Sequence, residues 1–378
     1  MTVMRALSDL GQSVWLDYLH RDMTRSGALE RMVHDGLRGV TSNPTIFERA
    51  LGSGNAYDRS IAELADSALS DRAVYETLAI QDVQEAADVL SGVYWDTDGA
   101  DGFVSLEVSP DVARDAKATV AEARRLWQFV NRPNVMIKIP GTREAWPAIE
   151  QSLRDGININ VTLLFSIEHY EAVADAYIHA LEARVAQGLP ISHIASAASL
   201  FVSRVDAEID RRIDSTAGAL ASLRGRTAIA NAQLVYARFR ELLDSPRWKA
   251  LQARGARPQR PLWASTGTKD PAYSDIRYVQ ALIGPQTITT VPPDTLRLFE
   301  DHGVAELSLP GDSFRARRTM NAIAAAGIRF SEVNFLLEEE GLAKFARSLT
   351  AMLAVIHDKR AVLSVPAVEA ITPVSSQR

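Results

Sequence analysis

The stretch VMIKIPGTREAWPAIEQSLRDGININVTLLF, residues 135–165, decides the fold because it holds two strand-like runs with a longer segment between them. VMIKIP (135–140) and NINVTLLF (158–165) are short, rich in β-branched residues and centred 25 residues apart. A unit of strand, helix and parallel strand takes roughly 30 residues. The stretch therefore predicts one such unit, with its two strands side by side.

Six further runs of the same kind extend this pattern along the chain. Five of the seven gaps between neighbouring centres span 25–35 residues, which suits one helix each, and the other two span 64 and 67. Eight strands alternating with helices predict an α/β protein built as a (β/α)8 TIM-type barrel with extra helices. An open doubly wound sheet with a helical second domain is the alternative. The six runs are SVWLDYL (13–19), GVTSNP (39–44), FVSLEV (103–108), HIASAASLF (193–201), RPLWASTG (260–267) and TITTVP (287–292).

Helical patterns fill the segments between the runs. Ser166 and Glu168 provide an N-cap and a first-turn acid for a helix after the fifth strand. We expect one barrel domain over residues 1–360 and a loose tail over 361–378, where periodicity is lost and two prolines occur. Apolar spacing predicts helices over 60–92, 111–130, 203–214 and 331–360, and basic, proline-containing residues 244–261 predict a surface excursion.

Composition excludes several classes of protein. Hydrophobic residues make up 47% and charged residues 23%, so the chain is not intrinsically disordered. A net charge of −6 argues against nucleic acid or an anionic membrane as partner. No apolar run approaches the roughly 18 residues of a membrane span, and no secretory signal is evident, so a cytoplasmic location is expected. Cysteine is absent, and no dinucleotide, P-loop, zinc-protease or nucleophile-elbow motif occurs, so neither a metal nor an organic cofactor is predicted.

Lys138 is the first candidate catalytic residue, because it stands inside the apolar run NVMIKIPGT. Strand alternation puts it on the face opposite Ile137 and Ile139, which in a barrel is the interior. Enclosure makes the charged form costly, and the neutral amine can attack a carbonyl to give an imine. A structural lysine paired with a carboxylate is the alternative.

Further polar residues recur near the ends of other strands. Asp17, Asn43, Glu107, Asn160 and Thr162 occupy comparable positions in their runs. Each one alone suits a helix cap or a turn, as Asn43 before a proline does. Together they favour a site, since barrel enzymes place their catalytic residues at the carboxyl ends of the strands.

An anion site is predicted beside these residues. Arg204 follows the sixth strand, and Ser265 and Lys269 lie in WASTGTKDP after the seventh, where barrels often bind phosphate. Hydroxyls, backbone N–H groups and an ammonium can together hold one anion. A glycine turn with a solvated lysine is the alternative.

These segments together resemble transaldolases, which act through a lysine Schiff base, and the length resembles that of the longer bacterial members. The matching motifs appear in family order. They are WLDYL (15–19), GVTSNPTIF (39–47), SLEVSP (105–110), IKIPGT (137–142), GININVTLLFS (156–166), ASLFVSRVD (198–206) and WASTGTKDP (263–271).

The resemblance implies catalytic roles for four residues. Lys138 matches the lysine that forms the imine, and Asp17 matches the acid/base that takes the C4 hydroxyl proton during carbon–carbon cleavage. Glu107 and Thr162 match the pair that holds a water and shuttles protons during imine formation and hydrolysis.

It also implies a set of substrate contacts. Asn43 and Asn160 match the groups that bind hydroxyls of the dihydroxyacetone unit, and Ser199 matches another contact. Phe201 matches a position that keeps the site apolar, where the related fructose 6-phosphate aldolases carry tyrosine.

The phosphate anchor is where the chain departs from the family pattern. Arg204 and Ser265 match it, but many transaldolases follow that serine with Phe-Arg, whereas this chain has Thr-Gly-Thr-Lys. Lys269 is the candidate second cation, and an ammonium orients a phosphate less tightly than a bidentate guanidinium does.

The implied reaction moves a dihydroxyacetone group from sedoheptulose 7-phosphate or fructose 6-phosphate to an aldose phosphate, within the pentose phosphate pathway. Phosphorylated sugars are the expected partners, no cofactor is needed, and both a monomer and a homodimer stay open. Two alternatives remain: an aldolase of the fructose 6-phosphate or deoxyribose-phosphate type with the same lysine, and a barrel that binds sugar phosphates without turnover.

Overall fold

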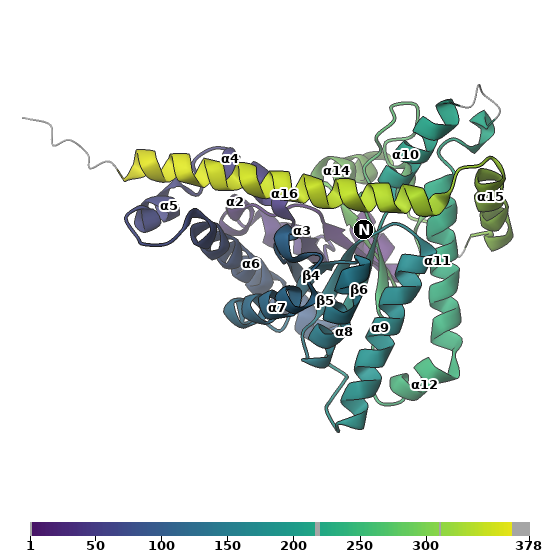
Figure 1. Ribbon diagram of the computed structural model, residues 1–378, viewed down its shortest axis with the longest axis horizontal. Helices are drawn as coiled ribbons and strands as arrows, with labels where there is room; N and C mark the ends of the chain where they lie inside the picture. Colours follow the sequence, from purple (N-terminus) through teal and green to yellow (C-terminus); the bar gives the residue numbers. More distant parts are fainter. Residues whose placement is uncertain (1, 216–219, 310, 365–378) are drawn as a thin grey trace, which may run out of the picture.

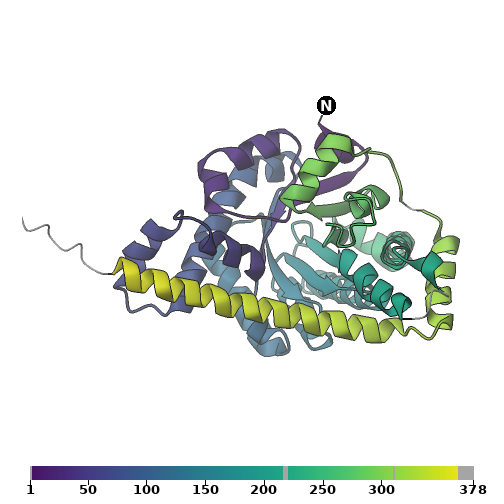
Figure 2. The same ribbon diagram turned by 90° about the horizontal axis from the view of Figure 1, so that it is seen from above.

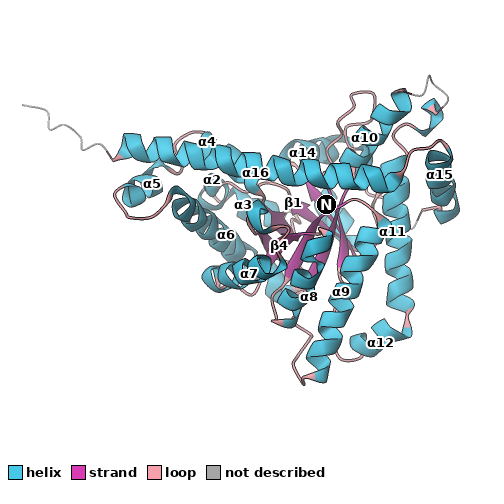
Figure 3. Ribbon diagram, in the orientation of Figure 1, coloured by secondary structure: helices cyan, strands magenta, loops and turns pink. Residues whose placement is uncertain are grey.

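A computed structural model of the chain describes residues 2–215, 220–309 and 311–364. Its eight strands are all parallel and form a closed barrel in chain order (Figures 1 and 3). Pairing of the first strand with the last closes the sheet, which confirms the predicted barrel and excludes an open doubly wound sheet. The strands are β1 (Gln12–Leu16), β2 (Gly39–Thr41), β3 (Phe103–Glu107), β4 (Val135–Pro140), β5 (Ile159–Leu164), β6 (Ser196–Phe201), β7 (Arg260–Ala264) and β8 (Thr287–Val291).

Helices surround the barrel, and none of those described is both long and apolar enough to cross a bilayer. The last helix, α16, runs across the molecule and contacts α4, α5, α6 and α10 (Figures 1 and 2). The helices are α1 (Val3–Asp9), α2 (Arg21–Arg25), α3 (Ala28–His34), α4 (Pro44–Gly52), α5 (Asp58–Ala65), α6 (Asp71–Asp96), α7 (Ala116–Val130), α8 (Trp146–Arg154), α9 (Ile167–Ala186), α10 (Ser203–Asp214), α11 (Thr227–Asp244), α12 (Pro246–Gln252), α13 (Arg277–Ala281), α14 (Pro293–His302), α15 (Ser313–Ala325) and α16 (Phe330–Leu363), with short 3-10 turns at Pro110–Val112, Arg143–Ala145 and Ala221–Leu223.

Three of the predicted helical boundaries are wrong. Segment 60–92 is two helices, because Ser70 caps a new helix by accepting from the Ala73 N–H. Segment 111–130 likewise restarts at an Asp115 cap after a 3-10 turn. The last helix spans Phe330–Leu363, slightly longer at both ends than the predicted 331–360. Residues 365–378 of the predicted tail lie outside the described residues.

The predicted surface excursion at 244–261 is also partly wrong. Pro246 opens α12, which buries Trp248 and Leu251, and Arg260 already belongs to β7. Proline is compatible with the first helical turn, where its missing N–H has no partner in any case, so here it marks a helix start.

The strand register brings alternate side chains into the barrel. Asn160 of β5 reaches Ser105 of β3 past the intervening β4, at 3.0 Å, which is feasible only through the interior. Glu107, Lys138 and Asn160 are register partners on β3, β4 and β5, so Lys138 also faces inward. Lower in the barrel, a Cβ on Gly39 would come within 2.6 Å of the Trp15 indole, which explains a glycine at that close approach. The register thus groups polar side chains at the carboxyl ends of the strands.

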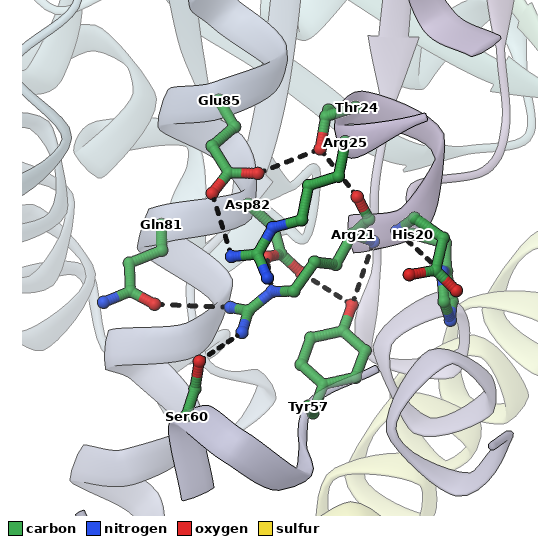
Figure 4. A network of polar contacts seen from close by, with 10 residues as sticks. His20, Arg21, Thr24, Arg25, Tyr57, Ser60, Gln81, Asp82 and Glu85 are labelled. Carbon is green, nitrogen blue, oxygen red and sulfur yellow. Dashed lines mark hydrogen bonds and ion pairs between the residues drawn. The ribbon is translucent and has the colours of Figure 1, made fainter. Parts of the chain in front are cut away.

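A buried polar network joins α2, α5 and α6 beside the barrel (Figure 4). The Arg21 guanidinium donates to Asp82 at 2.8 Å and to Ser60 at 2.7 Å, and the Tyr57 hydroxyl donates to the other Asp82 oxygen at 2.6 Å. The guanidinium also lies 4.5 Å from the centre of the Tyr57 ring. Because both partners are fully buried and hydrogen-bonded, this network fixes the relative positions of the three helices.

Candidate active site

Lys138 is held at the carboxyl end of β4 with its amine enclosed. Only 4% of the residue is exposed, and its Nζ lies 3.2 Å from Glu107 Oε2 and 3.2 Å from the Ser42 carbonyl oxygen. The Phe345 ring of α16 covers the amine, with its centre 5.9 Å from Nζ. The Lys138 amine therefore pairs with one carboxylate, is covered by one aromatic ring and is accessible from a cavity.

Glu107 is a carboxyl group that can exchange a proton with Lys138. Burial raises the pKa of Glu107, the nearby Asp17 charge adds to the rise, and Lys138 opposes it. Within the described part of the chain, no group hydrogen-bonds to either Glu107 oxygen besides the ion-paired lysine. The protonated carboxyl with a neutral amine is thus closer in free energy to the ion pair than it would be in water.

Asp17 follows β1 and lines the same cavity. The Thr41 hydroxyl donates to Asp17 Oδ1 at 2.9 Å and lies 2.7 Å from the Thr290 hydroxyl. These contacts tie β1, β2 and β8 together and orient the carboxylate without neutralising it.

Asn160 lies behind the cavity wall. It is fully buried, donates to Ser105 and accepts from the Ser199 hydroxyl at 2.6 Å, whereas Ser199 itself lines the cavity. Asn160 therefore orients Ser199, and its direct contact with a substrate hydroxyl, which the resemblance implies, stays a prediction. Thr162 lines the cavity, and its buried hydroxyl has no hydrogen-bond partner among the residues described.

Asn43 serves a local structural role and also faces the cavity. Its Oδ1 accepts from the Ile46 N–H at 3.0 Å and so caps α4, with Pro44 in the first turn. The capping role that its position before proline suggested is present, and its amide N–H₂ is still available as a donor.

Cationic groups gather at the other side of the cavity. Arg204 in the first turn of α10 lies 5.1 Å from the centre of the Phe201 ring, and Lys269 follows β7. Burial lowers the pKa of Arg204, and burial followed by the charge of Arg204 lowers the pKa of Lys269. Ser265 adopts φ +54°, a left-handed conformation rare for non-glycine residues, and its hydroxyl lies 3.0 Å from that of Ser203. Strain of this kind recurs at functional sites.

The cavity itself measures about 280 Å³ and collects most of the predicted residues. Nine of the eleven line it directly, while Glu107 and Asn160 stand behind Lys138 and Ser199. The nine are Asp17, Asn43, Lys138, Thr162, Ser199, Phe201, Arg204, Ser265 and Lys269.

A larger cavity of about 470 Å³ opens at the amino-terminal end of the barrel. Its charges are largely paired within the protein: Asp101 accepts from Trp15 and Ser13 and lies 3.5 Å from Arg260, and Arg257 pairs with Asp98. Size alone would favour this cavity, but most of its charged side chains are paired within the protein, whereas the cations of the smaller cavity, Lys138 apart, have no ion-pair partner among the described residues. Gln12 Oε1 is one polar atom of the larger cavity that has no partner there. The smaller cavity is therefore the candidate site.

Arg49 on α4, and Lys344 and Phe345 on α16, are among the cavity residues that the sequence did not predict. On amphipathic helices a cation or an aromatic residue carries no distinctive pattern. One signal was available, namely Gly341 within the last helix. A Cβ there would come within 2.8 Å of Leu163, so this glycine marks where α16 packs closely against the barrel. In the part of the chain that the structure describes, no cluster of His, Cys, Asp or Glu could hold a metal ion.

Comparison with known proteins agrees with this geometry. The profile of a family described as "Transaldolase/Fructose-6-phosphate aldolase" matches residues 14–356. A protein of Thermobifida fusca named "Transaldolase" is 48% identical over 93% of this chain and 96% of its own length. Transaldolases of Saccharopolyspora erythraea and Frankia alni are 48% and 45% identical, over 94% and 93% of this chain and 97% and 95% of their own. The chain therefore belongs to the transaldolase family.

Proposed function

We propose that Lys138 is the residue through which this chain carries out transaldolase chemistry, moving a dihydroxyacetone group between sugar phosphates. The observation that carries the proposal is the buried pair of Lys138 and Glu107, 3.2 Å apart at the edge of a cavity that Asp17 also lines. Glu107 accepts a proton from the ammonium, because burial raises the affinity of its carboxylate for protons. The amine that this transfer leaves is nucleophilic.

The reaction then proceeds in steps that the surrounding groups can serve. The Lys138 amine attacks the C2 carbonyl of a ketose phosphate and water leaves, which gives the imine. Asp17 takes the proton of the C4 hydroxyl, the C3–C4 bond breaks, and an aldose phosphate departs. The remaining three-carbon enamine attacks the aldehyde carbon of a second aldose phosphate, Asp17 returns the proton, and hydrolysis of the new imine frees Lys138.

Transfer to an aldehyde requires that the enamine is neither protonated nor hydrolysed before the second aldose phosphate binds. The Phe201 ring lines the cavity and packs edge-on against the Phe165 ring, with the two ring centres 5.5 Å apart, and the Phe345 ring covers the Lys138 amine. These rings limit water beside Lys138 and provide no hydroxyl that could donate a proton. They support transfer over the simple aldolase reaction, which is the second candidate. A cytoplasmic location and the choice between monomer and homodimer stay predictions.

Borohydride trapping tests the role of Lys138. Incubation with fructose 6-phosphate and reduction should add one sugar-derived mass, located by peptide mass spectrometry at Lys138. Lys138→Met should give no adduct and keep its fold by circular dichroism, while Lys117→Met, which removes an exposed lysine of α7, should label normally. No adduct in the natural chain, or equal labelling of Lys138→Met, would overturn the proposal. Products measured with and without erythrose 4-phosphate then separate transfer from aldol cleavage.

A further inference from the structure

Four cations face the open side of the cavity, from four different elements. Arg204 lies on α10, Lys269 follows β7, Arg49 lies on α4 and Lys344 on α16. In the described residues, none of the four forms an ion pair or a hydrogen bond with a protein group. Acidic residues are nearby, since Asp17 and Glu340 act on Arg204 and Glu48 acts on Lys344, but none makes a direct contact. Arg49, Lys269 and Lys344 are exposed to solvent and Arg204 is half-buried, so water can solvate them, but four unpaired cations at one cavity of a chain with net charge −6 favour an anionic ligand there.

The negative charge of one bound phosphate, together with that of Asp17, is close to the positive charge of the four cations. A sugar phosphate carries nearly two negative charges at neutral pH, and Asp17 contributes another to the same cavity. Arg204 and Lys269 alone would leave surplus negative charge once the phosphate binds. Addition of Arg49 and Lys344 turns the balance positive, which favours binding of the dianion from water.

The chemistry of the groups points the same way. The segment after β7 supplies one ammonium, that of Lys269. Arg49 of α4 adds a second guanidinium beside that of Arg204, and a guanidinium can hold two phosphate oxygens through parallel N–H donors. Mutual repulsion is already visible, because burial and then the charges of Arg204, Lys269 and Arg49 lower the pKa of Lys344.

The packing of α16 against the barrel explains why Lys344 lies at the cavity. Gly341, Lys344 and Phe345 are spaced three and four residues apart and so share one face of the helix. An added Cβ at Gly341 would lie 2.8 Å from Leu163 and 3.6 Å from the Arg204 guanidinium, so the helix backbone rests directly on the barrel mouth. The same face of α16 therefore places the Phe345 ring over the Lys138 amine and the Lys344 ammonium at the cavity, together with Arg49, Arg204 and Lys269.

We propose that Arg49 and Lys344 complete the phosphate anchor begun by Arg204, Ser265 and Lys269, and that α16 is thereby a working part of the active site. The inference rests on the proposed function, because it assigns the phosphate of the ketose bound at Lys138. It makes Arg49 and Lys344 specificity residues for phosphorylated over unphosphorylated sugars.

The test compares imine formation with fructose 6-phosphate and with fructose, which lacks the phosphate, so that no acceptor is involved. In Lys344→Met and in Arg49→Met, half-saturation by fructose 6-phosphate should rise about tenfold, and about a hundredfold in the double variant. Labelling by fructose should change less than about twofold in each. Inhibition by inorganic phosphate should weaken in parallel. Arg347→Met, which removes an exposed cation of α16 that does not line the cavity, is the matched control and should behave as the natural chain.

The outcomes separate the two proposals. If the natural chain forms no adduct at Lys138, the proposed function fails. If it labels normally and the Lys344 and Arg49 variants keep their half-saturation by fructose 6-phosphate, the phosphate assignment fails alone. Equal losses with fructose 6-phosphate and fructose would also overturn the assignment, because they would show a structural effect on the site.

Discussion

Two buried ion pairs in this molecule differ in one respect that separates structure from chemistry. Arg21–Asp82 and Lys138–Glu107 are both nearly inaccessible, at 2.8 Å and 3.2 Å, and burial raises the pKa of both carboxyl groups. In the first pair both Asp82 oxygens accept hydrogen bonds, and the guanidinium has further acceptors (Figure 4). In the second pair the glutamate has no hydrogen bond from residues 2–215, 220–309 or 311–364 besides the lysine contact, and the lysine faces a cavity.

This difference shows that burial and a raised carboxyl pKa do not by themselves identify a catalytic group. A fully hydrogen-bonded pair cannot change its protonation or its partner without loss of several contacts, so it holds helices in place. A pair with spare hydrogen-bonding capacity beside a cavity can transfer its proton and accept a new partner. Hydrogen-bond completeness is therefore the more informative property.

Substitution of the cation in each pair should give opposite results, and this is the largest expected effect. Lys138→Met should lower turnover by about 10⁴-fold or more, because it removes the amine that we propose forms the imine. Its urea unfolding midpoint should fall less than that of Arg21→Met, because burial favours the neutral form of Glu107, and this carboxyl can take up a proton once its cation is gone.

Arg21→Met should instead lower the free energy of unfolding by about 3–5 kcal/mol, because Asp82 is left buried without its cation. Turnover per folded molecule should change less than about twofold. Urea titration followed by circular dichroism, alongside initial rates, measures both variants. A loss of stability in Lys138→Met as large as that in Arg21→Met, or catalytic loss in a folded Arg21→Met protein, would break the distinction between the two pairs.

Asp17→Asn sharpens the comparison by removing a cavity carboxylate outside either pair. Cleavage should slow by roughly 10²–10⁴, the usual range for loss of a general base, while borohydride trapping at Lys138 still succeeds. Rapid-quench measurement of aldose phosphate release, with adduct formed in parallel, separates the two steps. Asp294→Asn is the control, because Asp294 lies at the cavity rim but pairs with Arg297. An unchanged cleavage rate in Asp17→Asn would refute its assigned role.

The barrel and its inner polar row could be predicted from the sequence, because both follow from local periodicity. Alternation along β4 places Lys138 opposite Ile137 and Ile139, and the register then aligns it with Glu107. Which of these polar residues reach the cavity could not be predicted. The depth of Asn160 behind Ser199 depends on how neighbouring side chains fill the barrel, and strand alternation does not encode it.

The contribution of α16 was not predictable for a different reason. Residues Lys344 and Phe345 are more than 200 positions from Lys138 and lie on a helix outside the barrel repeat. Their position depends on how that helix packs across the mouth, which is a tertiary contact with no local signature. Arg49 was missed in the same way, since only the direction of α4 brings it toward the cavity.

Among the active-site carboxylate and lysine variants, Glu107→Gln should have the smallest catalytic effect, about 10²-fold at neutral pH, because Glu107 relays protons and forms no bond to substrate. Its raised pKa places the acidic limb of the kcat–pH profile above the ordinary value of 4.5. On that limb the rate should climb as pH rises, because ionisation creates the carboxylate that accepts the Lys138 proton. Glutamine cannot ionise, so the variant should lose this limb. Glu122→Gln is the matched control: burial also raises the Glu122 pKa, but this carboxylate accepts from the Ser109 N–H and lies outside the cavity, so the profile should keep its shape. An intact limb in Glu107→Gln would mean that the limb belongs to another group, and would remove Glu107 from the proton path.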